Sequence, residues 1–338
     1  MKLITVRLVV VTALAFAALG SAATSASAAP RPAATAAASA ITVKAGVNTV
    51  KDPNVAVTEF LPEVVTIASG TSVTWSWADT IEPHSVTFFP TGTTPPPPGS
   101  DEALFAPTPG SSYFGTALVN SGLQPQGDAP PPAFSVSFPE AGEFTYYCVI
   151  HPNMTGTVKV VAPDQKYDTA AAVTARGKRE ALRWTAEGLA AKKKLESTKP
   201  VRTKASDGTS TWDVAMGATT EHTDVLAFAP APTKIKHGDS IRFVNNSQAP
   251  HTGTFRGSQA GIVDPTAPET STPIPGPSPQ TLNATDVFNT GELAPDAGSP
   301  APPIEARSFT FVVPTAGKYP FYCILHLPSG MATNLQVS

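Results

Sequence analysis

The sequence predicts an all-β protein in which a helical linker joins two β-sandwich domains. Three observations lead to this prediction. The sequence repeats itself, short segments of alternating apolar and polar residues are separated by turn signals, and a helix-forming segment without proline lies between the two copies. Short strands of period two with turns between them are typical of a β-sandwich, and 338 residues leave room for two domains of ordinary size.

The N-terminal segment has the three parts of a secretory signal peptide. A basic n-region, an apolar h-region and an A-x-A cleavage site follow one another, at Lys2 and Arg7, at 8–19 and at Ala26-Ser27-Ala28. The apolar run is too short for a permanent membrane span. After cleavage of residues 1–28 we therefore expect an exported protein without a membrane span, located in the periplasm, at the cell surface or outside the cell. Residues 29–40 are rich in Ala, Pro and Ser and are expected to form a flexible tail.

The charge of the mature chain excludes one class of partner. The segment 1–28 holds two basic residues and no acidic one, so its removal changes the formal net charge from −3 to −5. A mildly acidic exported protein has no electrostatic attraction for a phosphate backbone. We therefore expect no nucleic acid among its partners.

The first predicted domain spans 41–162 and the second spans 203–338, and both begin with the same pattern. In each copy a strand, a glycine turn and a second strand lead to a Pro-His pair. These are 64–67, Gly70, 73–77 and Pro83-His84 in the first copy, and 234–236, Gly238-Asp239, 241–245 and Pro250-His251 in the second.

The later part of each copy repeats more clearly. Residues 121–123, 134–138 and 139–144 correspond to 290–293, 308–311 and 314–319, and a closing strand follows at 156–161 or 333–337. Each copy also holds a long loop with ten prolines, at 91–133 and at 257–305. We expect most of each loop to be poorly ordered; the alternative is a cover over the edge of a metal site or a docking surface.

Residues 163–202 form the predicted linker, with a helix expected within 164–199. Strong helix formers and the absence of proline favour the helix, whereas Gly177 and Gly188 count against it. Its basic residues are Arg176, Lys178, Arg179, Arg183 and 192–194. We expect them to form a solvated face, with docking to an acidic partner as the alternative.

One motif that occurs twice carries the chemistry. In each copy a Cys-x-x-His motif stands at the end of a predicted strand, a methionine follows it and another histidine precedes it. Two imidazole nitrogens, one thiolate and a weak axial thioether are the ligands of a blue-copper electron-transfer site. The sequence therefore predicts two copper ions per chain, with the ligands His84, Cys148, His151 and Met154 in one site and His251, Cys323, His326 and Met331 in the other.

The alternatives to copper are a disulfide, zinc and a metal-free sandwich. Two cysteines in an exported chain usually form a disulfide, but this bond would leave both His/Met loops without a thiolate. Zinc does not usually take thioether ligands. A lone Cys-x-x-His is weak evidence, whereas four ligand types in the same order in both copies favour copper.

On these motifs, both halves resemble the cupredoxins, the family of plastocyanin, amicyanin and pseudoazurin. The loop from Cys148 to Met154 is similar to the short amicyanin spacing, and the loop from Cys323 to Met331 is similar to the plastocyanin spacing. The resemblance covers about 41–162 and 203–338. It implies a Greek-key β-sandwich in each half and one-electron transfer between redox protein partners, and it implies a carrier, not an enzyme. The duplication, the linker and the proline-rich loops depart from single-domain carriers, so the resemblance identifies neither the redox partners nor the physiological pathway. The sequence does not set the oligomeric state.

Two other functions compete with electron transfer. Multicopper oxidases and copper nitrite reductases also join cupredoxin domains, but their catalytic coppers need further histidines. Of the six histidines here only His222 and His237 are unassigned, and no His-x-His occurs. Copper sequestration or delivery would use the same ligands. Exposed Met- or His-rich tracts are absent, however, and Met216 is expected to fill the core.

Overall fold

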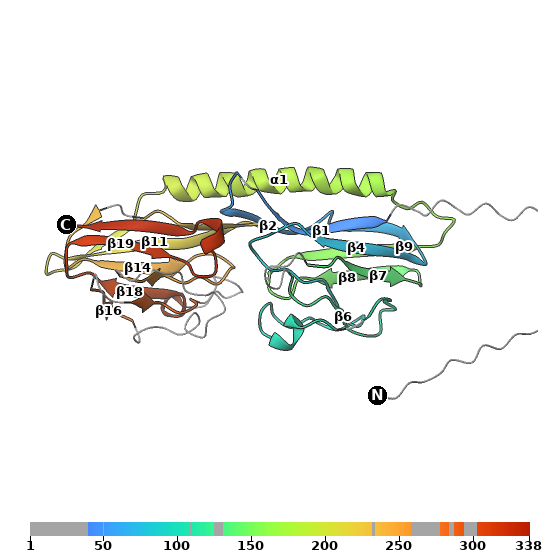
Figure 1. Ribbon diagram of the computed structural model, residues 1–338, viewed down its shortest axis with the longest axis horizontal. Helices are drawn as coiled ribbons and strands as arrows, with labels where there is room; N and C mark the ends of the chain where they lie inside the picture. Colours follow the sequence, from blue (N-terminus) through green and yellow to red (C-terminus); the bar gives the residue numbers. More distant parts are fainter. Residues whose placement is uncertain are drawn as a thin grey trace, which may run out of the picture. The chain divides into compact units, whose positions relative to one another are not determined.

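Figure 1 shows the computed structural model, which describes residues 40–49, 51–108, 110–124, 131–231, 234–257, 278–283, 287–293 and 303–338. The predicted signal peptide and residues 29–39 of the predicted tail lie outside this set. The described residues form mostly β-strands together with one α-helix, α1 (Ala170–Ser197), so the fold class is all-β. In this part of the chain no helix combines the length and the apolar character that crossing a membrane requires.

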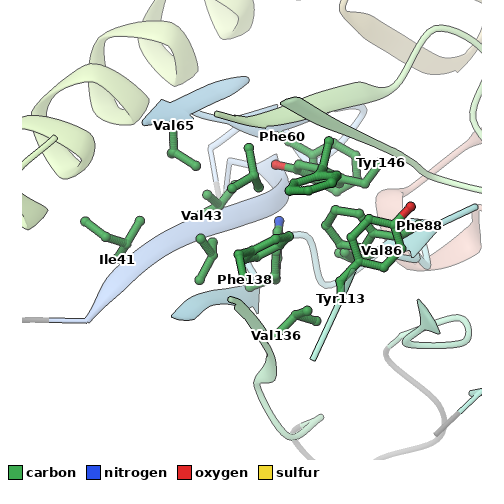
Figure 2. Packing of buried hydrophobic residues seen from close by; sticks show 14 of the residues in the cluster. Ile41, Val43, Phe60, Val65, Val86, Phe88, Tyr113, Val136, Phe138 and Tyr146 are labelled. Atoms are coloured by element: carbon green, nitrogen blue, oxygen red, sulfur yellow. The ribbon is translucent and has the colours of Figure 1, made fainter. Parts of the chain in front are cut away.

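The strands before α1 form two sheets around one apolar cluster. One sheet has the order β2 (Val55–Leu61), β1 (Ile41–Asn48), β4 (Thr71–Trp77), β7 (Phe134–Phe138), and the other has the order β3 (Val64–Ala68), β9 (Thr155–Val161), β8 (Gly142–Tyr147), β5 (Thr87–Phe88), β6 (Val119–Asn120). Alternate residues of these strands point into the cluster. Figure 2 shows Phe60 of β2 against Tyr146 of β8, with ring centroids 4.6 Å apart. Cys148 and Met154 belong to the same cluster.

The strands after α1 repeat this arrangement. One sheet has the order β16 (Gln280–Thr281), β18 (Ser308–Val312), β14 (Ser240–Asn245), β11 (Ser210–Thr219), β12 (Thr223–Phe228), with β10 (Arg202–Lys204) on β11. The other has the order β13 (Lys234–Ile235), β20 (Ala332–Val337), β19 (Gly317–Tyr322), β15 (Thr254–Phe255), β17 (Phe288–Asn289). Their cluster contains Cys323 and Met331, and also Met216, as the sequence predicts.

A direct strand pairing joins the two halves. β2 and β12 run antiparallel with Val57 opposite Thr223 and Val55 opposite Val225, so the first sheets of both halves merge into one sheet of ten strands. The sequence repeat does not include β1 or β11, and it includes only the ends of β2 and β12, in Phe60-Leu61-Pro62 and Phe228-Ala229-Pro230. The strands that connect the halves were therefore not predicted.

The helix α1 lies in the predicted segment and packs on β1, β2, β11 and β12. It begins after Thr169, whose hydroxyl accepts a hydrogen bond from the Ala172 amide at 3.2 Å. Gly177 and Gly188 are buried, and a Cβ on them would lie 2.8 Å from the Leu61 carbonyl and 2.4 Å from Val55. By propensity alone these glycines count against a helix, but in the structure they allow the helix to approach the strands closely.

The basic residues of α1 divide into two groups. Arg176 pairs with Asp168 at 2.7 Å and Lys192 with Asp52 at 3.3 Å, which ties both parts of the helix to the strand layer. The remaining basic residues are exposed, namely Lys178, Arg179, Arg183, Lys193 and Lys194. Most of the face is therefore solvated, in agreement with the sequence prediction.

One buried carboxyl group in β2 makes stability depend on pH. Glu59 is 7% exposed, and burial, with smaller contributions from Glu63 and Glu221, raises its pKa from 4.5 to about 8. Between these two pH values the folded chain holds a proton that the unfolded chain has released. The free energy of unfolding must therefore fall as the pH rises through this window.

We expect Glu59→Gln to be more stable than the wild type at pH 8, by an amount on the order of 1–3 kcal/mol, because glutamine cannot ionise. The difference should shrink as the pH falls towards 4.5, because the carboxyl of Glu59 then keeps its proton in both the folded and the unfolded chain. Thermal unfolding of the metal-free protein between pH 5 and 9 measures the difference. The exposed Glu140→Gln serves as the control and should show no gain that grows with pH; an equal gain in both variants would contradict the assignment to Glu59.

Candidate metal centres

Three predicted ligands meet in the first half of the chain. The Nδ1 atom of His84 lies 3.1 Å from Nδ1 of His151, which lies 3.3 Å from Sγ of Cys148. The three residues are 0%, 7% and 3% exposed, respectively. Two imidazole nitrogens this close repel unless they share a proton or a metal cation, so the arrangement is compatible with a metal ion between them.

The second half repeats this geometry. The Nδ1 atoms of His251 and His326 are 3.0 Å apart, and Sγ of Cys323 lies 3.8 Å from the first and 3.4 Å from the second. All three residues are buried. The structure thus brings together six of the eight predicted ligands, in two separate groups.

The short first loop is closed by its own backbone. Cys148 follows β8 and Met154 precedes β9, and the Cys148 amide donates to the Met154 carbonyl at 3.0 Å. Asn153 has a φ of 66°, which the tight return to β9 requires. Since the loop is anchored at both ends, Cys148 and His151 are held on the same side of it.

The second loop is longer and contains an additional turn. A 3-10 turn, Leu327–Ser329, follows His326 and ends at Gly330, which has a φ of 77°. The Cys323 amide still donates to the Met331 carbonyl at 3.0 Å. The extra turn therefore absorbs the longer His–Met spacing and keeps the anchor of the loop unchanged.

The two methionines are buried beside the cysteines. Met154 is 1% exposed and Met331 is 0% exposed, and each belongs to the apolar cluster of its half. This environment suits a soft, weakly bound thioether. Their role as axial ligands stays a prediction.

The two cysteines are free, which excludes the disulfide alternative in this structure. Backbone amides donate to both sulfurs, from Ser85 to Cys148 at 3.5 Å and from Thr252 to Cys323 at 3.4 Å. Burial alone would raise the pKa of each thiol, but the facing histidines hold it well below its usual range. Both sulfurs are thus prepared to be thiolates, the form that binds metals.

A glycine lies against each upstream histidine. Gly46 and Gly217 have φ values of 64° and 76° at bulges in β1 and β11, where the strand register shifts. A Cβ on Gly46 would lie 2.1 Å from Nε2 of His84, and one on Gly217 would lie 2.6 Å from Nε2 of His251. The sequence motifs do not reveal these residues, although a glycine recurs at the same place in both copies.

The outer nitrogens of the upstream histidines meet different partners. Nε2 of His84 lies 3.6 Å from a carboxylate oxygen of Asp79, whereas Nε2 of His251 lies 2.8 Å from the Ser247 hydroxyl. The first centre therefore has a charged group behind its histidine and the second has a neutral one. Such partners change the basicity of a metal-binding imidazole.

The histidines of the two loops share one carboxylate, which the sequence motifs do not reveal either. Glu82, 3% exposed, places Oε2 at 3.2 Å from Nε2 of His151 and Oε1 at 3.1 Å from Nε2 of His326. Burial alone would raise the pKa of Glu82, but these histidines hold it well below its usual range. Asp224 lies close by, within 4.8 Å of the donor atoms of Glu82 and His151.

Part of the first proline-rich loop covers the first centre. A cavity of about 290 Å³ is lined both by Pro95 to Pro98 of this loop and by Cys148, His151 and Met154. The Gly99 amide donates to the Val149 carbonyl at 2.7 Å, which fastens this stretch to the cysteine loop. For these residues the structure favours the alternative of a cover; much of the second loop lies outside the described residues.

The two unassigned histidines belong to neither group of candidate ligands. The His222 ring stacks on Trp184 of α1 with centroids 3.4 Å apart, and its Nδ1 lies 3.2 Å from Glu187. This contact holds β12 against the helix. His237 is exposed beside the turn at Gly238, as the sequence predicts.

Comparisons with known proteins give similar solved structures. Neither a family model nor a curated protein matches the chain. Amicyanin from Paracoccus versutus (Thiobacillus versutus) is 21% identical, with 37% of this chain and 85% of that chain covered and a TM-score of 0.23. A variant of amicyanin in the reduced Cu(I) form at pH 4 is 22% identical, with 37% and 86% covered, and a variant in the reduced state is 24% identical with the same coverage; both have a TM-score of 0.23.

The donor set itself decides which metal fits. Each centre offers two imidazole nitrogens and one thiol prepared for ionisation, in a buried and largely apolar setting with a methionine nearby. This combination matches the ligands that copper takes in electron-transfer sites. The residues present therefore fit copper.

We expect Gly46→Ala to abolish copper binding at the first centre, because the new methyl group would displace His84. Gly217→Ala should have the same effect at the second centre through His251. Titration with copper sulfate should then give one ion per chain in each variant. Gly70→Ala is the matched control, since Gly70 has a φ of 81° but no neighbouring atom within 4 Å of a Cβ. An equal loss of copper in the control would assign the effect to backbone strain.

Proposed function

We propose that the protein is an exported one-electron carrier with two type 1 copper sites in two tandem cupredoxin-like domains. The observation that carries this proposal is the convergence, in each half, of two imidazole nitrogens and one thiol with separations of 3.0–3.8 Å. His84, Cys148, His151 and Met154 would hold one copper ion, and His251, Cys323, His326 and Met331 the other. Export is supported by the signal-like segment 1–28, and the redox protein partners are unidentified.

Equivalent hydrogen bonds around the two centres support a tandem duplication. In each half a hydroxyl that follows the upstream histidine accepts from the amide that follows the cysteine, and a threonine hydroxyl donates to an asparagine. These bonds are Val149 to Ser85 at 2.9 Å and Ile324 to Thr252 at 2.9 Å, and Thr87 to Asn120 at 2.8 Å and Thr254 to Asn289 at 3.1 Å. Two unrelated sandwiches would not be expected to share such side-chain detail.

Bound copper supplies reversible Cu(II)/Cu(I) chemistry, and the residues of the chain make that change easy. The anchored loops and the bulged glycines hold the donors in place before the metal binds. Amides that donate to each sulfur and the apolar clusters around it exclude water and limit rearrangement. A rigid site that suits both oxidation states favours electron transfer over substrate turnover.

Two alternatives remain distinguishable from this proposal. A copper enzyme of the oxidase or nitrite reductase type would need a further copper, yet His222 is engaged by Trp184 and Glu187. A copper delivery protein would use the same ligands, but the donors here are buried under apolar groups and closed loops, which favours retention of the metal.

The test is to load the purified mature chain with copper sulfate and measure copper content, the visible spectrum and stability to redox cycling. We expect two coppers per chain, an intense thiolate-to-copper band, and repeated reduction and oxidation without loss of metal. Loss of copper on reduction would favour delivery. A third copper with oxidase or nitrite-reducing turnover would favour an enzyme, and absence of copper would end the proposal.

Single cysteine substitutions should separate the two sites. Cys148→Ser should remove one blue centre and leave the other, and Cys323→Ser should do the reverse, because the two sulfurs belong to different apolar clusters. Copper content and the visible and EPR spectra measure this. If either single change removes both centres, the two sites are not independent.

We expect Asp79→Asn to raise the reduction potential of the first centre. The carboxylate of Asp79 lies behind His84 and stabilises the more highly charged Cu(II) state, whereas asparagine keeps the shape of the side chain without its charge. A potentiometric titration in the Cys323→Ser background isolates the first centre. The same substitution in the Cys148→Ser background should leave the potential of the second centre unchanged, and an equal shift in both backgrounds would count against a local effect.

A further inference from the structure

A single buried carboxylate connects the two candidate metal centres. In His151 and in His326, Nδ1 faces the cysteine of its own centre, whereas Nε2 faces Glu82. An imidazole, a carboxylate and a second imidazole therefore follow one another between Cys148 and Cys323. Between the two rings only two non-covalent gaps occur, of 3.2 and 3.1 Å.

The turn that carries Glu82 is shaped to reach the second half. Asp79 accepts hydrogen bonds from the amides of Ile81 and Glu82 at 2.8 and 3.1 Å, which fixes the turn after β4. Ile81 packs against the apolar cluster of the second half. Glu82 is thereby held between two loops that are far apart in the sequence.

The carboxylate occurs only once although the motif around it occurs twice. The segment Glu82-Pro83-His84 corresponds to Ala249-Pro250-His251 in the second copy. If each domain paired its own loop histidine with an acid, the chain would carry two such acids. Here Glu82 alone contacts both His151 and His326. Burial of a carboxylate is costly unless it is paired, and the two imidazoles provide that pairing. This arrangement indicates a role in linking the centres and not in building either of them.

Neighbouring contacts keep the link in place. The β2–β12 pairing joins the halves, and Asn54, next to β2, donates to the Ser329 carbonyl at 2.7 Å. Ser329 lies in the turn that follows His326, and its hydroxyl donates to the His326 carbonyl at 2.7 Å. The first half therefore holds the loop that presents His326 to Glu82.

We propose that Glu82 couples the two centres, so that one electron passes between them within a single chain. This inference rests on the proposed function. With copper held by the His151 group and by the His326 group, one electron would leave the reduced centre and enter the oxidised one. No bond forms or breaks, and the protons on both Nε2 atoms stay in place. Glu82 acts through His151 and His326 and is a positioning residue.

The test uses the full mature chain loaded with copper sulfate, in the wild type and in two variants. Glutamine in Glu82→Gln cannot accept from both N–H groups at once, and Glu82→Leu removes both contacts. A pulse-generated organic radical reduces a fraction of the oxidised centres, and the visible spectrum follows redistribution of the electron. The Cys148→Ser and Cys323→Ser variants supply the spectrum of each centre alone. Glu59→Gln, a buried acid that contacts neither histidine pair, is the matched control.

We expect the wild type and the control to show a first-order phase whose rate does not depend on protein concentration. Glu82→Gln should slow this phase by about 10- to 100-fold, and Glu82→Leu by at least as much. The EPR spectra of the centres and the dipolar Cu(II)–Cu(II) distance should stay unchanged, which a merely structural role would not predict. If Glu82→Leu does not fold, the comparison between Glu82→Gln and the wild type decides.

Other outcomes overturn the inference in distinguishable ways. Two coppers with no first-order phase in the wild type, or with an unaltered rate in both variants, reject coupling through Glu82 and leave the proposed function standing. A rate proportional to protein concentration assigns the exchange to collisions between molecules. A third metal ion that is lost in Glu82→Gln would make Glu82 and Asp224 ligands instead of a link. A chain that binds no copper rejects the proposed function itself.

Discussion

The antiparallel pairing of β2 with β12 is the contact on which the arrangement of both centres depends. It merges one sheet of each half into a continuous sheet, and α1 packs across the strands on either side of it. All seven residues of β2 are buried, as expected of a strand with paired neighbours on both edges and a helix packed against it. Because the backbone sets this junction, the loops of His151 and His326 meet at a fixed separation.

The buried charges of the junction depend on one another. Each thiolate is stabilised by a facing histidine, and the histidines of both loops are in turn paired with Glu82. Removal of any member would leave an unpaired charge among buried side chains, which costs more than the loss of a surface ion pair. A cation bound among the donors would balance the negative charge that these pairs leave uncompensated. Because the apolar clusters bury them, the thiols, the histidines and Glu82 depend on one another for charge pairing.

The sequence predicted the features that depend on a few neighbouring residues and missed those that depend on residues far apart in the chain. The loop ligands and the helix follow from spacing and residue type within a few positions, and the upstream histidines follow from the repeat. Glu82 was missed because its role depends on two loops separated by more than 170 residues, which only the β2–β12 junction brings together. Gly46 and Gly217 were missed because a bulge becomes evident only once the strand register is known. Gly177 and Gly188 were misinterpreted because helix propensity does not include packing against strands.

The turn from Asp79 to His84 combines three roles in six residues. It supplies a candidate ligand in His84, the carboxylate behind that ligand in Asp79, and the carboxylate shared by both centres in Glu82. The hydrogen bonds of Asp79 to the amides of Ile81 and Glu82 hold these groups in one conformation. In the second copy the corresponding segment supplies a ligand and a neutral partner but no second carboxylate. The two halves thus have matching donor sets but different surroundings, and the asymmetry is concentrated in the one turn that contacts both.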